Sequence, residues 1–170
     1  MTVALSLPRQ SAVVFIGKAL ALSALIALSA HVKVPFWPVP MTLQTMAVMG
    51  IAGLFGAQLG VAAMLAYLVE GAFGLPVFAS GVGVQVLAGP TAGYLVGMIA
   101  AAWIVGSARG GWMRAAAILV GTAVIYAFGV AWLSTMIGVQ KAFTAGMLPF
   151  LLGDAVKGGL VWAAAALRRR

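Results

Sequence analysis

Long apolar runs separated by short polar breaks dominate this sequence. They divide into six segments, and a helix of about 20 apolar residues crosses the hydrocarbon core of a membrane. We place the segments at residues 11–30, 41–55, 59–73, 91–105, 115–138 and 146–167. Because the second and third are short and broken by glycine and proline, we expect them to line a cavity or lean on neighbouring protein. The pattern predicts an all-α integral membrane protein with six transmembrane helices, forming a single polytopic domain over residues 1–170.

The composition supports this fold class and excludes most soluble functions. Of the 170 residues, 64% are hydrophobic and 7% are charged, whereas a soluble domain carries about 25% charged residues. Two acids, one His and no Cys are too few ligands for a catalytic metal site or an iron–sulfur cluster. The sequence contains no GxxxxGK[ST] pattern for ATP hydrolysis. We therefore expect neither an enzyme nor a nucleic-acid-binding protein, and no metal or cofactor.

The positive charges predict the orientation, because Lys and Arg concentrate on the cytoplasmic side of membrane proteins. With the N-terminus inside, the cytoplasmic set is Arg9, Arg109, Arg114, Arg168, Arg169 and Arg170, and the outer set is Lys33 and Lys141. This excess favours both termini in the cytoplasm. It also places residues 31–40, residues 74–90 and the start of the last segment on one outer face.

Two ionisable residues, Asp154 and Lys157, lie inside the last apolar segment, in LLGDAVKGGLVW. A charged group within hydrocarbon costs at least about 2.5 kcal/mol on insertion scales and by default marks a functional site. Their i, i+3 spacing places both side chains on one helix face, close enough to pair. We expect them to form the polar floor of an outward-facing pocket; the alternative is an ion pair that only fixes helix packing. The other acid, Glu70, is expected at the outer interface.

The segment VPFWPVPMTLQT, residues 34–45, joins the first two apolar runs and contains three prolines. Proline fixes φ and removes a backbone donor, so we expect this loop to form a defined cap over the pocket. Thr42 and Gln44 can offer a hydroxyl and an amide to a ligand. Trp37 is either an aromatic anchor at the membrane interface or a ligand contact. Tyr94, near the start of the fourth segment, directs its hydroxyl either into the cavity or toward the headgroups.

Small residues recur with helical spacing in two segments. In the first, Ala19, Ser23 and Ala27 form a stripe on one helix face, typical either of internal packing or of a docking surface for another membrane subunit. In the fourth, Gly93 and Gly97 are spaced four apart and predict a close-packed helix face.

Four motifs occur here in the order found in a known family. The segments VPFWPVPMTLQT, GLPVF with a glycine-rich stretch, GPTAGYLVG and LLGDAVKGGL resemble those of BioY, the biotin-binding S components of energy-coupling factor (ECF) vitamin transporters. The resemblance implies capture of biotin from the outside by an ECF S-component fold. It also implies docking onto a transmembrane coupling (T) subunit with two cytoplasmic ABC-type ATPases, in a multi-pass protein of the bacterial inner membrane.

The resemblance places the family's acid and lysine on Asp154 and Lys157, and their chemistry suits biotin. The ureido ring of biotin carries two N–H donors that flank a carbonyl. A carboxylate can accept from the N–H groups and an ammonium can donate to the carbonyl in charge-assisted hydrogen bonds. The apolar thiophane ring would then rest on Phe36, Phe78 and Tyr94.

The resemblance also assigns the loops and the docking surface. The substrate-capping first loop falls on residues 34–44, and a polar side chain of the third loop falls on Ser80, although this loop lacks the expected asparagine. The docking surface falls on Ala19, Ser23 and Ala27. The predicted substrate-binding residues are Asp154, Lys157, Gln44, Thr42, Trp37, Phe36, Phe78, Ser80 and Tyr94.

Three alternatives remain open at this point. The first is an S component for a different vitamin, which a competition panel would reveal. The second is a non-transporting integral subunit of a membrane complex, with Asp154 and Lys157 as a structural pair and no bound small molecule. The third is a solitary facilitator or proton-coupled carrier, which uptake without a coupling subunit would reveal.

Overall fold

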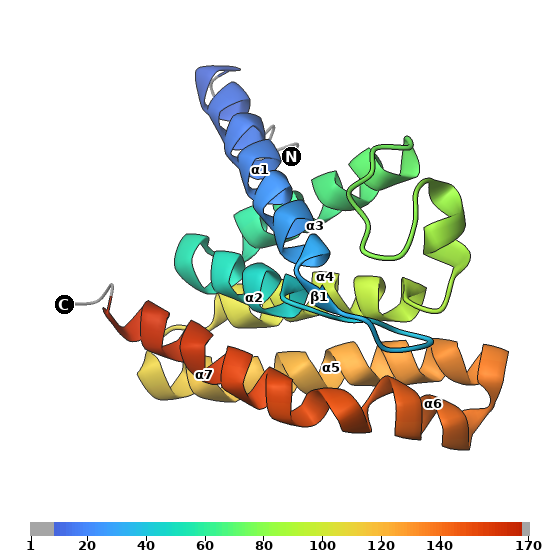
Figure 1. Cartoon of the computed structure of the whole chain (residues 1–170). Helices are drawn as coiled ribbons and strands as arrows, with labels where there is room; N and C mark the ends of the chain where they lie inside the picture. The colour runs from blue at the N-terminus through green and yellow to red at the C-terminus, as the bar shows by residue number, and fades with distance from the viewer. Residues whose placement is uncertain (1–8, 168–170) are drawn as a thin grey trace, which may run out of the picture.

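The computed structural model describes residues 9–167, and helices make up most of this range (Figure 1). The α-helices are α1 (Arg9–His31), α2 (Gln44–Phe55), α3 (Ala57–Ala72), α4 (Ala92–Ser107), α5 (Gly111–Ile137), α6 (Val139–Gly146) and α7 (Leu151–Leu167). Two short strands, β1 (Lys33–Val34) and β2 (Met41–Thr42), pair antiparallel, and two 3-10 helices, η1 (Val84–Ala88) and η2 (Leu148–Phe150), lie in connections. The predicted helical fold is confirmed. Arg168, Arg169 and Arg170, which entered the orientation prediction, lie outside the described residues.

The last predicted segment, residues 146–167, differs most from the structure. The helical chain begins earlier, with α6, and is interrupted by η2 before α7 begins. Pro149 lies in η2 and cannot donate a backbone hydrogen bond, so the helix stops and restarts there. Within the described range, residues 12–31, 111–137 and 139–167 are long and apolar enough to cross a membrane, while α2, α3 and α4 are shorter apolar helices.

Single glycines make two of the helix connections. Gly56 joins α2 to α3 with φ +93°, and Gly138 joins α5 to α6 with φ +83°. Residues other than glycine rarely adopt a positive φ, so a glycine at these positions allows a sharp turn without a loop. The helices on either side of each glycine therefore contact each other directly.

Helix α4 lies at the centre of the bundle and packs against α2, α3 and α5. Its closest neighbour is α5: a Cβ on Gly93 would lie 2.3 Å from the carbonyl oxygen of Phe128, and one on Gly97 would lie 2.8 Å from the Cα of Ile125. The predicted close-packed glycine face is thus confirmed. Helix α7 packs against α2 and α5, and α1 packs against α3 and α2.

Large apolar side chains cover the outside of the bundle. Val13, Leu28, Trp112, Leu119 and Leu152 are each more than two thirds exposed. Such a surface would aggregate in water, whereas hydrocarbon accommodates it. Together with the apolar helices, it identifies the chain as a multi-pass membrane protein.

Candidate functional site

Asp154 and Lys157 lie one turn apart on α7 and form an ion pair, with 2.8 Å between the Nζ of Lys157 and the Oδ1 of Asp154. Both are buried, with 8% of Asp154 and 6% of Lys157 exposed. Helix α7 can bring the pair into the bundle because Gly158, on the next turn, approaches Ile118 of α5; a Cβ there would lie 3.0 Å from that side chain. The predicted pairing within the last helix is therefore present.

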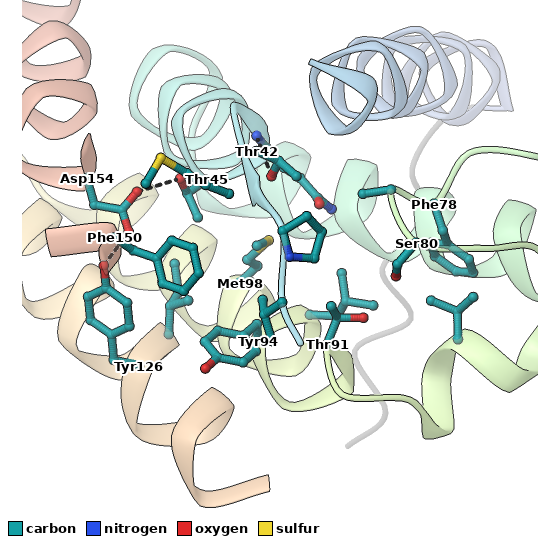
Figure 2. A pocket seen from close by; sticks show the side chains of 18 of the residues that line it. Thr42, Thr45, Phe78, Ser80, Thr91, Tyr94, Met98, Tyr126, Phe150 and Asp154 are labelled. Carbon is teal, nitrogen blue, oxygen red and sulfur yellow. Dashed lines mark hydrogen bonds between the residues drawn. The ribbon is translucent and has the colours of Figure 1, made fainter. Parts of the chain in front are cut away.

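Three further groups hold this pair in place. Thr45 of α2 donates from its hydroxyl to Oδ1 of Asp154 at 3.3 Å, and Tyr126 of α5 donates to Oδ2 at 2.5 Å. Figure 2 shows these two hydroxyls meeting the carboxylate from different helices. Lys157 donates a second hydrogen bond to the backbone carbonyl of Thr42 at 2.7 Å. Donors from α2, α5 and α7 thus converge on one carboxylate.

The network leaves limited capacity for a ligand. A carboxylate offers about four lone-pair positions and an ammonium three donors. Asp154 already accepts three hydrogen bonds and Lys157 donates two. About one acceptor position and one donor therefore remain, and both residues line the same cavity.

This cavity encloses about 630 Å³ of space between protein atoms, part of it open to the outside. Small-molecule sites are mostly apolar, with a few polar groups that fix the orientation of the ligand. Its apolar walls include Val39, Leu95, Met98, Ile125 and Phe150. Among the described residues, no three His, Asp or Glu side chains gather in a way that could hold a metal ion. The arrangement therefore suits binding of an organic ligand.

Gln44, at the start of α2, also lines the cavity and is 4% exposed. Its buried Nε2 has no partner at normal hydrogen-bond geometry within the described part of the chain, although the side chain interacts with the hydroxyl of Tyr67. An unsatisfied buried donor costs about 1–3 kcal/mol. An amide donor without a well-formed hydrogen bond is therefore a second indication that the cavity receives a ligand with an acceptor atom.

The cap predicted from the prolines is a β-hairpin. Lys33 of β1 pairs with Thr42 of β2, and the hairpin approaches α7, where a Cβ on Gly153 would lie 3.1 Å from the sulfur of Met41. The ammonium of Lys33 also donates a hydrogen bond to the carbonyl of Ala79 in the connection between α3 and α4. The hairpin and this second connection are thus joined over the cavity.

Most of the predicted substrate-binding residues meet in this cavity. The lining includes Thr42, Gln44, Phe78, Ser80, Tyr94, Asp154 and Lys157. The two exceptions are Phe36 and Trp37. Phe36 packs edge-to-face on Phe150, which lines the cavity, with ring centroids 5.8 Å apart. Trp37 is 84% exposed and does not line the cavity, which favours the alternative of an interfacial anchor.

The hydroxyl of Tyr94 takes neither of its two expected directions. It donates to the backbone carbonyl of Gly146 at 2.7 Å, which ties α4 to the end of α6. The ring, and not a free hydroxyl, is therefore what Tyr94 contributes to the cavity (Figure 2).

Two tyrosines of the site were not predicted from the sequence. Tyr126 binds Asp154, and Tyr67 of α3 is fully buried in the cavity wall, edge-to-face with Phe78 at a centroid distance of 5.3 Å. The available signal was weak: a tyrosine within an apolar helix usually finds a partner for its hydroxyl. That rule does not say where along the chain the partner lies.

The small-residue stripe on α1 faces the inside of the chain. Ala19 and Ser23 are buried, Ala27 is half-buried, and the hydroxyl of Ser23 donates to Oε1 of Glu70 on α3 at 2.7 Å. A partner cannot reach Ala19 or Ser23 while α1 packs on α3, so the alternative of internal packing applies to them. Glu70 is likewise half-buried against α1 and bonded there.

Comparisons with known proteins agree on one family. The BioY family matches residues 6–170 of this chain. Over 137 residues, 79% of this chain and 83% of the relative, the chain is 43% identical to the probable biotin transporter BioY of Pyrococcus horikoshii. Over 142 residues, with the same coverage of both chains, it is 39% identical to the biotin transporter BioY of Thermotoga maritima.

A solved structure shares the fold. The S-component for biotin from an ECF-type ABC transporter superposes with a TM-score of 0.80 and covers 97% of this chain and 96% of its own. The two sequences are 22% identical. The likeness therefore concerns the arrangement of the helices.

Proposed function

The chain belongs to the BioY family, and from this premise we propose that it captures biotin at the outer face of a membrane as the S component of an ECF transporter. The observation that carries the proposal is the buried Asp154–Lys157 pair, which lines a cavity that is partly open to the outside. No structural need explains a charged pair there, because an apolar pair of similar size would stabilise the bundle as well or better.

The remaining hydrogen-bonding capacity of the cavity suits the head group of biotin. Asp154 accepts from a ureido N–H, while the free donor of Lys157 and the unpaired amide of Gln44 face acceptors such as the ureido carbonyl. The thiophane ring rests on Phe78 and Tyr94, which line the same cavity. An analogue without these polar groups leaves buried donors unpaired and binds weakly.

Transport requires partners that the chain itself does not supply. We propose that a transmembrane T subunit and two cytoplasmic ABC-type ATPases provide the energy, since the sequence has no ATP-binding loop. The chain would lie in the bacterial inner membrane as one domain with six crossings and with both termini in the cytoplasm. The positive charges near the inner ends of the apolar segments support this orientation.

Replacement of Asp154 tests the proposal most directly. Asp154→Asn keeps the size of the side chain but removes the charge, so we expect at least about a tenfold loss of affinity for biotin. The measurement is equilibrium binding of labelled biotin to purified protein in detergent. Glu70→Gln is the matched control, because it neutralises the only other acid in the sequence, and it should leave biotin affinity unchanged. Unaltered binding by Asp154→Asn would refute the assignment.

The same preparation distinguishes the alternatives. Native mass spectrometry after mild extraction should show biotin bound to the wild-type chain. A different vitamin that displaces biotin in a competition panel would identify another S component. Absence of any bound small molecule, together with no measurable biotin binding, would favour a purely structural subunit.

A further inference from the structure

Tyr126 bears directly on the site because its hydroxyl donates a hydrogen bond to the carboxylate of Asp154. It is 6% exposed, belongs to α5, and donates to Oδ2 at 2.5 Å, while Thr45 and Lys157 both donate to Oδ1. Resting on the proposed function, we propose that Tyr126 is a positioning residue that orients Asp154 and thereby sets the selectivity of the pocket for an unsubstituted ureido N–H.

The first step of the argument is the orientation of the carboxylate. Donors from three helices fix both oxygens, so the carboxylate cannot rotate about its side-chain bond without breaking at least one charge-assisted hydrogen bond. Oδ1 accepts two hydrogen bonds and Oδ2 accepts one. The acceptor position left for a ligand is therefore on Oδ2, next to the hydroxyl of Tyr126.

The second step concerns the ring of Tyr126. Tyr126 and Asp154 line the cavity and also an apolar groove between α5 and α7, whose other walls include Ile118, Leu119 and Ala155. The ring thus stands between the cavity and the membrane-facing groove. Tyr126→Phe keeps this wall and removes only the hydroxyl, which makes it a clean test of orientation.

The chemical consequence follows from the single free acceptor. A ureido nitrogen that bears a methyl group has no N–H to donate, so an analogue methylated on the nitrogen facing Asp154 gains nothing from the orientation of that carboxylate. Biotin itself has this N–H and donates it to the oriented carboxylate. Loss of the Tyr126 hydroxyl therefore weakens biotin binding more than it weakens binding of that analogue.

The experiment measures affinities of the purified full chain for four ligands: biotin, the two analogues methylated on one or the other ureido nitrogen, and an analogue with oxygen in place of the ring sulfur. For Tyr126→Phe we expect biotin affinity to fall about tenfold, the scale of one hydrogen bond to a charged group. The oxygen analogue should fall with it. For one of the two methylated analogues the affinity should change less than about twofold, so the preference for biotin over that analogue shrinks at least about fivefold.

Two other variants complete the test. Thr122→Val removes a hydroxyl from α5 one turn before Tyr126; that hydroxyl bonds the carbonyl of Ile118 at 2.9 Å and lines the groove, not the cavity. It should leave all four affinities unchanged. Thr45→Val removes the donor to Oδ1 and should shrink the same preference by a smaller factor, about threefold. If Tyr126→Phe does not fold, Thr45→Val still tests whether the orientation of Asp154 sets the preference for biotin.

Each outcome supports or overturns the inference. Equal losses for biotin and both methylated analogues in Tyr126→Phe, or no loss at all, overturn it and show a merely structural tyrosine. An unchanged preference in Thr45→Val counts against it in the same way. Failure of the wild-type chain to bind biotin instead overturns the proposed function, and this is seen before any variant is made.

Discussion

The two acids of the chain stand in contrasting surroundings. Asp154 pairs with Lys157 and accepts hydroxyl hydrogen bonds from Thr45 and Tyr126 at the edge of a cavity. Glu70 accepts one hydrogen bond, from Ser23, and has no Lys or Arg at salt-bridge distance among the described residues. The first region joins α2, α5 and α7 around a space for a ligand, whereas the second joins α1 to α3 and does not line that cavity.

The contrast shows that a hydrogen-bonded carboxylate within the bundle does not by itself mark a functional site. What separates the two regions is spare hydrogen-bonding capacity facing an empty volume: one acceptor position on Asp154, one donor on Lys157 and the unpaired amide of Gln44. The region around Glu70 contributes to assembly of the bundle. Variants that act on one region and spare the other test this division.

The largest effect is expected from Lys157→Met. It leaves Asp154 buried without its cation, a change that costs about 3–5 kcal/mol of unfolding free energy, and it removes a ligand donor. Biotin binding should fall at least a hundredfold, and the thermal unfolding temperature in detergent should drop. In the double variant Asp154→Asn with Lys157→Met, the unfolding temperature should largely recover while binding stays lost. Recovery of both would show that the pair serves structure alone.

The next effect concerns the outer side of α1. Its exposed face carries Ala21 and Ala24, whereas Ala19 is buried. If a T subunit packs on this exposed face, Ala21→Trp or Ala24→Trp should reduce its co-purification at least tenfold and leave biotin affinity unchanged, because small residues permit close helix approach. Ala116→Trp, on the exposed side of α5, is the matched control and should co-purify normally. Normal co-purification of both α1 variants would move docking to another helix.

A smaller effect is expected from Gln44→Met. The change removes an unpaired buried amide, so the unfolding free energy of the empty protein should stay the same or rise by about 1 kcal/mol. Biotin affinity should fall about tenfold, because the ligand loses a donor. Isothermal titration and thermal unfolding on the same sample measure both quantities. A loss of stability would contradict the assignment of Gln44 to ligand binding.

The smallest effect is expected from Ser23→Ala. It removes the single hydrogen bond to Glu70, and the expected cost is about 1 kcal/mol of unfolding free energy. Biotin affinity should stay within twofold of the wild-type value. A large loss of affinity would mean that the two regions are coupled, and the division between them would fail.

The sequence predicted the part of the site that has a local signature. Asp154 and Lys157 are conspicuous because they interrupt an apolar helix at a spacing that permits pairing, and the prolines of residues 34–45 indicate a rigid cap. Tyr126 has no such signature. Its partner lies 28 residues away on another helix, and only the packing of α5 on α7 brings them together.

The orientation of α1 was also beyond the sequence, for a different reason. Alanine and serine occur on every face of this helix, so a small-residue stripe can be drawn on the buried side as well as on the exposed side. The contact between Ser23 and Glu70 decides which face is buried, and it depends on the placement of α3. Pro149 lies inside the predicted segment of residues 146–167, and the apolar residues on both sides of it are typical of an uninterrupted helix.

The hydrogen bond from Lys157 to the carbonyl of Thr42 bears on the rates of binding. It ties the end of the hairpin to α7. Movement of the hairpin away from α7 must break it, at a cost of about 1.5–3 kcal/mol, so the tied form outnumbers the untied form roughly tenfold to a hundredfold. If biotin enters only through the untied form, its association is slowed by the same factor, and its escape is slowed likewise.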